Sequence, residues 1–192
     1  MIVLFTFSSG VSLEPVSRWW SKEFSVSYTV TSPEDGTTNA KYIIGDRKIR
    51  FEFEEEGETV IMLMDFSSDP VDAVMLLPAA KQYMPLPLTF ENEESREILG
   101  IAVPIESPEH PCASIWDCQQ LGNEPVSGRP AIKWRITDAE DDPTILWADR
   151  DTGFPIMIED SDDSVFKLLD LQIGSQPASL FEIPGDYQPF SY

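Results

Sequence analysis

Apolar and polar residues alternate along much of this chain with a period of two. Apolar side chains occupy every second position from Phe24 to Val30, with serine and threonine between them. The same alternation runs from Lys48 to Glu54, where isoleucine and phenylalanine are separated by charged residues. Because successive side chains of a strand point to opposite faces of a sheet, both stretches predict strands with one buried face.

Further short strands are expected between turn sequences such as Gly45-Asp46 and Glu56-Gly57. They cover residues 39–44, 59–66, 71–77, 80–84, 121–126 and 131–136. Short strands at this spacing favour an all-β sandwich or barrel. The alternating strands require only one covered face.

The last third of the chain reads as an antiparallel meander. A strand over 145–149 is followed by the turn Asp151-Thr152-Gly153, a second strand over 154–159 and an apolar segment over 165–173. Pro184-Gly185 ends the pattern. Between the two β-rich parts, residues 90–99 have helical composition and precede Gly100, a suitable helix C-cap.

Composition indicates one globular domain of acidic character. The 192 residues are 42% hydrophobic and carry a formal charge of -21, with 34 acidic and 13 basic residues. Such a chain is repelled by phosphate backbones, so nucleic acid is not expected as a partner. The acidic runs 54–56 and 160–163 are interpreted as solvated strand ends. Calcium at 160–163 is the alternative, but that run lacks the glycine and closing glutamate of an EF-hand loop.

Candidate chemistry is sparse. Cys112 and Cys118 have neither the spacing of a CxxC redox pair nor enough companions for a zinc site. A local disulfide between them and two free thiols both remain open. His110 is the single histidine and lies in a proline-rich loop. We therefore expect no metal and no cofactor.

The N-terminal segment, residues 1–20, is treated separately from the rest of the chain. Residues 1–7 are apolar and residues 8–12 are small, which is typical of the end of a secretory signal. The segment lacks a basic start, so a truncated signal and a first buried strand are the alternatives. Export to the periplasm is the expected localisation, with the cytoplasm as the alternative.

Several short motifs, taken in order, resemble the LolA/LolB-like superfamily of lipoprotein carriers. They lie at 42–53, 76–84, 128–134, 147–149, 152–155 and 180–184. The resemblance implies a mainly β domain over residues 21–192. Its fold would be a strongly curved antiparallel sheet, an incomplete β-barrel with short helical segments plugging the mouth. It also implies a role in the bacterial envelope.

On this resemblance, the concave face would bind a hydrophobic ligand such as a lipid or a lipoprotein acyl chain. Every second residue of a curled sheet lines its interior. The expected ligand-binding residues are Phe24, Val26, Tyr28, Val30, Ile49, Phe51, Phe53, Ile61, Leu63, Trp134, Ile136, Leu146 and Phe166. The alternative is that these side chains fill a closed core.

Two other functions remain open. The start of the domain also resembles the violacein-pathway enzyme VioE, which has this fold and acts without a cofactor. On that hypothesis Ser27, Asp65 and Lys167 would be catalytic groups near the pocket. The third hypothesis is a protein-interaction or sensor module of the envelope, with a protein partner.

Overall fold

The computed structural model describes residues 22–33, 36–67, 70–88, 117–137 and 143–191. The N-terminal segment 1–20, the expected helix at 90–99 and the loop with His110 and Cys112 lie outside these residues. The signal sequence, the helical plug and the disulfide therefore stay predictions. Within the described residues, no helix has the length and apolar character needed to cross a membrane.

The described residues form two antiparallel meanders that share one sheet. The first meander contains β1 (Phe24–Ser32), β2 (Gly36–Ile44), β3 (Lys48–Glu55), β4 (Glu58–Asp65), β5 (Val71–Leu77) and β6 (Gln82–Leu88). The second contains β7 (Asp117–Asn123), β8 (Ala131–Thr137), β9 (Pro143–Asp149), β10 (Pro155–Glu159) and β11 (Val165–Ile173). Pairing of β1 with β11 joins them.

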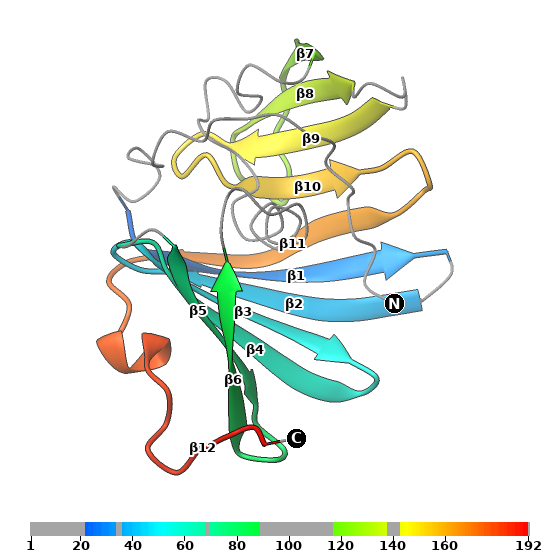
Figure 1. Cartoon of the computed structure of the whole chain (residues 1–192). Coiled ribbons are helices and arrows are strands. Elements are labelled where there is room, and N and C mark those ends of the chain that lie inside the picture. Colours follow the sequence, from blue (N-terminus) through cyan, green and yellow to red (C-terminus); the bar gives the residue numbers. More distant parts are fainter. Residues whose placement is uncertain (1–21, 34–35, 68–69, 89–116, 138–142, 192) are drawn as a thin grey trace.

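The sheet is strongly curved and stays open (Figure 1). Its strand order is β12-β6-β5-β4-β3-β2-β1-β11-β10-β9-β8-β7, so β7 and the short β12 (Gln188–Pro189) form the two ends. All pairs are antiparallel except β12 with β6. The expected fold class, a curved antiparallel sheet forming an incomplete barrel, is confirmed.

A tight hairpin between β3 and β4 shows how local sequence sets the register. Glu55 pairs with Glu58, which leaves Glu56 and Gly57 as the two turn residues. Both have positive φ, 53° and 81°, as a two-residue turn compatible with strand twist requires. The turn places Ile49, Phe51 and Phe53 opposite Met64, Met62 and Val60.

The largest apolar cluster lies on the concave face of the sheet. Its buried members on β1–β5 are Phe24, Val26, Tyr28, Tyr42, Ile44, Ile49, Phe51, Met62, Met64, Val71 and Ala73. Phe154, Ile156 and Leu168 bring the second meander into the same cluster. The core therefore contains side chains from both meanders and lies on the concave side of the β1–β11 pair.

Ile61 and Leu63 point to the opposite face of the sheet, which corrects their expected place in the interior. Cross-strand partners share a face, and Ile61 and Leu63 pair with Glu52 and Arg50. They pack with Leu76 in a separate cluster. Residues 60–64 are buried on both faces of β4, so periodicity could not decide which residues point inward.

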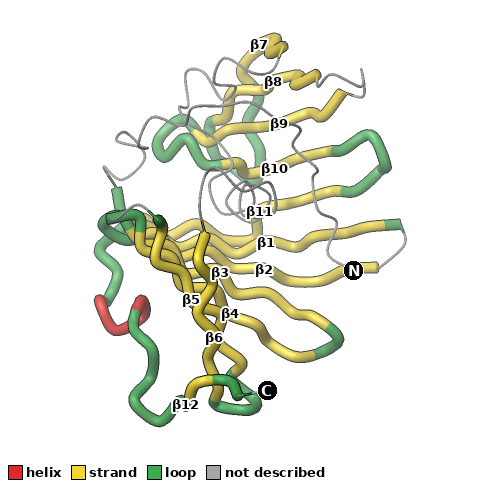
Figure 2. Tube along the Cα trace, in the orientation of Figure 1, coloured by secondary structure: helices red, strands yellow, loops and turns green. Residues whose placement is uncertain are grey.

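The C-terminal tail runs along the outside of this face (Figure 2). The short helical turn η2 (Ala178–Phe181) follows β11, and Arg50 donates a hydrogen bond to the carbonyl of Leu180 at 3.0 Å. Tyr187 then packs against the Ile61–Leu63–Leu76 cluster. The tail ends beside β6, where Gln188 N donates to the Lys81 carbonyl. It covers apolar surface that the open sheet would otherwise expose.

Candidate functional site

A ladder of aromatic rings crosses the concave face from β2 to β3. The rings of Tyr42 and Phe51 are stacked with centroids 4.4 Å apart. Phe51 and Phe53 are stacked at 4.9 Å. Tyr42 and Phe51 are buried, whereas Phe53 is half-buried at the end of the ladder. The ladder is therefore a buried aromatic stack that is accessible at one end, Phe53.

Phe154 extends this aromatic surface to the second meander. Its ring meets Phe24 edge-on at 5.3 Å and Tyr42 edge-on at 5.5 Å. The ring of Tyr28 lies 6.1 Å away. Phe154 comes from the loop between β9 and β10, so the shape of that loop sets its position.

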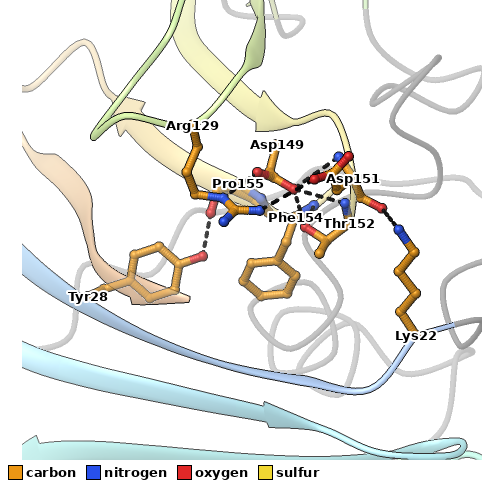
Figure 3. A network of polar contacts seen from close by, with 8 residues as sticks. All are labelled: Lys22, Tyr28, Arg129, Asp149, Asp151, Thr152, Phe154 and Pro155. Atoms are coloured by element: carbon orange, nitrogen blue, oxygen red, sulfur yellow. Dashed lines mark hydrogen bonds and ion pairs between the residues drawn. The ribbon is translucent and has the colours of Figure 1, made fainter. Parts of the chain in front are cut away.

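A buried carboxylate holds this loop in place (Figure 3). The side chain of Asp149 has 0% exposure and accepts hydrogen bonds at Oδ1 from the backbone N–H groups of Asp151 and Thr152, at 3.0 and 2.9 Å. The Thr152 hydroxyl donates to the same oxygen and accepts from Phe154 N. The same hydrogen bonds therefore fix both the turn and the position of the Phe154 ring.

Arg129 completes the network from the loop before β8. Its Nε donates to Asp149 Oδ2 at 2.6 Å, and its guanidinium lies 3.8 Å from the Asp151 carboxylate. Burial on its own would raise the pKa of Asp149, but the hydrogen bonds from Arg129 and Thr152 outweigh it and lower that pKa. The same contact raises the pKa of Arg129. Asp149 is thus a structural anion.

Tyr28 connects this network to the aromatic surface. Its hydroxyl donates a short hydrogen bond to the Pro155 carbonyl. Burial, with Tyr42 and the Asp149 charge, raises the pKa of Tyr28 well above its ordinary value. Burial also raises the pKa of Tyr42. Both phenols are neutral, so neither acts as a base at physiological pH.

The expected lining residues fall into four groups. The main cluster contains Phe24, Val26, Tyr28, Ile49 and Phe51, with Phe53 packed against it. A second cluster on β8–β10 contains Trp134 and Leu146, with Ile136 at its side. Phe166 and Val30 are half-buried cross-strand partners on β11 and β1. Ile61 and Leu63 lie on the outer face.

The expected catalytic residues do not converge. Ser27 alternates with the inward residues Val26 and Tyr28 and pairs with Lys41 on the outer face. Asp65, at the end of β4, makes an ion pair with Lys48 at 3.2 Å. Lys167 is exposed on β11. The arrangement offers no shared pocket for proton transfer among these three groups.

Sequence reasoning missed the Arg129–Asp149 pair and the ring of Phe154. The sequence places Asp149 at a strand end and Thr152 in a turn, and their spacing is the signal for side chain to backbone capping. Nothing in the sequence links Arg129 to a carboxylate 20 residues away. Among the described residues, no three His, Cys, Asp or Glu side chains are placed to hold a metal ion.

Comparison with solved structures finds similar proteins at low sequence identity. An uncharacterized conserved protein from Thermus thermophilus superposes with a TM-score of 0.60 and 13% identity, covering 92% of this chain and 94% of that one. MucB in complex with MucA(peri) superposes with a TM-score of 0.54 and 14% identity, covering 91% of this chain and 58% of MucB. The LolA superfamily protein NE2245 from Nitrosomonas europaea superposes with a TM-score of 0.36 and 13% identity, covering 86% of this chain and 91% of that one.

Sequence comparison identifies the family. No curated protein matches the chain significantly. Residues 25–153, which span β1 to the turn after β9, match the family described as "Domain of unknown function (DUF4412)". The match includes the aromatic ladder and both members of the Arg129–Asp149 pair. The chain belongs to the DUF4412 family.

Proposed function

We propose that this protein is a non-catalytic binding module that holds a hydrophobic ligand, such as a lipid or a lipoprotein acyl chain, on its concave face. The observation that carries the proposal is the continuous aromatic and aliphatic cluster on the concave side of an open sheet, which becomes accessible at Phe53. The three candidate catalytic groups do not meet, so binding is favoured over catalysis.

The composition of the surface suits an acyl chain. Met62 and Met64 lie beside Phe51 and Ile49, and methionine side chains adapt to flexible apolar ligands. Each methylene group removed from water contributes about 0.8 kcal/mol. Phe53 is half-buried at the end of the ladder and offers the ligand a point of contact. The ligand would therefore gain affinity mainly from buried chain length.

A protein partner in the bacterial envelope is the second candidate. Its support is the fold shared with MucB, whose structure was determined in complex with MucA(peri). For both candidates we propose a periplasmic location. They differ in the surface that is used, because a ligand needs the concave face.

The test compares two half-buried aromatic residues on opposite faces. Phe53 packs against the concave cluster, whereas Tyr83 packs against the outer one. Uptake of a fluorescent fatty acid should weaken about fivefold or more in Phe53→Ala and stay unchanged in Tyr83→Ala, because only the first removes inner apolar area. Native mass spectrometry of protein purified from cells should show a bound lipid. Absence of both lipid and uptake would refute the proposal.

A further inference from the structure

Trp134 has a buried indole N–H without a hydrogen-bond partner. The residue is 6% exposed, and no acceptor among the described residues reaches its Nε1. Leu146 and Ala148 are the buried members of its cluster, with Ile132, Ile136 and Ile158 packed against them. A buried donor that loses water without gaining an acceptor costs about 1–3 kcal/mol. Such a group calls for an explanation.

Trp147, on the neighbouring strand, has a hydrogen-bond acceptor for its indole N–H. Its Nε1 donates to Glu124 Oε2 at 3.3 Å, and the Lys133 ammonium lies 4.4 Å from its ring centroid. The two tryptophans are similarly buried, but only Trp147 has an acceptor. Among the described residues, Trp134 thus packs against aliphatic side chains, and its cross-strand partner Gln120 does not accept from its N–H.

Water does not explain the unpaired donor well. A buried water needs two to four polar partners. In the part of the chain that the structure describes, the side chains packed against Trp134 are aliphatic, and its polar cross-strand partner Gln120 is exposed. A carboxylate is also a poor acceptor here, since an unpaired charge in an apolar cluster is costly. Lys133 cannot compensate such a charge, because it forms an ion pair with Glu124. The best-suited acceptor is neutral and attached to an apolar chain.

An apolar row leads from Trp134 across the sheet. Trp134 pairs with Leu146, Leu146 with Ile158, and Ile158 with Phe166 on β11. Phe166 pairs with Val30, two residues beyond Tyr28 on β1. Cross-strand partners share a face, and the four steps of about 4.8 Å span about 19 Å. Ile158, Phe166 and Val30 are only half-buried, so the row keeps apolar surface for a long chain.

We propose that the Trp134 N–H donates a hydrogen bond to the neutral carbonyl oxygen of an acyl ester or amide, whose chain follows this row. The inference rests on the proposed function and deepens it. It names the ligand class, acyl esters or amides, and one recognition residue. Free hydrocarbons of the same length would lack the hydrogen bond.

Two ligands of matched length separate the hydrogen bond from the apolar contact. Methyl laurate carries an ester carbonyl, and tetradecane does not. Each competes with the fluorescent fatty acid for the wild type, for Trp134→Phe and for the control Trp147→Phe. We expect Trp134→Phe to weaken methyl laurate binding about tenfold and to leave tetradecane within about twofold, because phenylalanine keeps an aromatic ring and loses the donor. Trp147→Phe should not change the ratio of the two affinities.

A second readout uses the wild type and does not depend on a variant that folds. The indole ¹H–¹⁵N NMR signal of Trp134, assigned by its loss in Trp134→Phe or by residue-specific labelling, should move with methyl laurate and stay in place with tetradecane. If both compounds bind but neither the signal nor the affinity ratio responds, this inference is overturned and the proposed function stands. If neither compound binds, the proposed function fails and this inference fails with it.

Discussion

The Arg129–Asp149 contact gives the sharpest prediction about stability. Arg129→Met removes the only side-chain cation hydrogen-bonded to Asp149 among the described residues and leaves a carboxylate with 0% exposure. Breaking a buried ion pair from one side costs about 3–5 kcal/mol. Arg129 is itself 25% exposed, and Asp149 keeps its bonds from Asp151 and Thr152. We therefore expect a cost of about 3 kcal/mol, at the lower end of that range.

A double-mutant cycle isolates the pair from other effects. Asp149→Asn places an amide beside Arg129 and should also destabilise the fold, because two donors then face each other. The double variant removes both the unpaired charge and this conflict. Equilibrium unfolding in urea, followed by tryptophan fluorescence, should give a coupling energy of about 2 kcal/mol.

The Lys81–Asp186 pair is the matched control. Its N–O distance is 2.7 Å, close to the 2.6 Å of Arg129–Asp149, but its side chains are 64% and 58% exposed. Solvent screens such a pair, so its cycle should show no coupling beyond experimental error. Equal coupling in the two cycles, or a cost below about 1 kcal/mol for Arg129→Met, would refute the reasoning that burial decides the strength.

Three further predictions follow from the same contacts. The pKa of Asp149 is lowered in the folded protein. Its contribution to folding stability is therefore complete above its unfolded pKa of about 3.9 and is lost as the pH falls through the folded pKa. The difference in unfolding free energy between wild type and Asp149→Asn, measured in urea, should shrink from about pH 7 to about pH 2.5. A Cβ at Gly45 would lie 2.7 Å from the Phe181 ring, so Gly45→Ala should cost about 1–2 kcal/mol in wild type and much less in Phe181→Ala, measured by thermal unfolding. Burial raises the pKa values of Tyr28 and Tyr42, so an ultraviolet absorbance titration of the phenolate band should show both ionising only as the fold is lost; a normal midpoint for either would contradict their burial.

The sequence predicted the strands well where one face of the sheet is exposed to solvent. The alternation from Phe24 to Val30 and the Glu56-Gly57 turn agree with β1 and the β3–β4 hairpin. It failed for Ile61 and Leu63, because residues 60–64 are covered on both faces and carry no period. The tail that covers the outer face follows β11 directly in sequence, yet nothing in its residues shows where it docks.

The candidate site depended more on tertiary structure than the fold did. The apolar positions of β1 and β3 are readable from sequence because they share one strand each. Phe154 reaches the same cluster only through the β1–β11 junction and the Asp149 turn. Strand alternation predicts Trp134 among the ligand-binding residues, but its unpaired N–H depends on which side chains surround it.

Local sequence determined where the strands begin, where they turn and which residues alternate, since these depend on neighbours within a few positions. The tertiary structure decided which strands meet across the sheet and which side chains share a face. It also decided which polar groups lose water. Burial turned Asp149 into a structural anion that needs Arg129, and it left the Trp134 N–H without an acceptor in the described part of the chain. These properties arise from contacts between distant segments, and hydrophobic periodicity does not encode them.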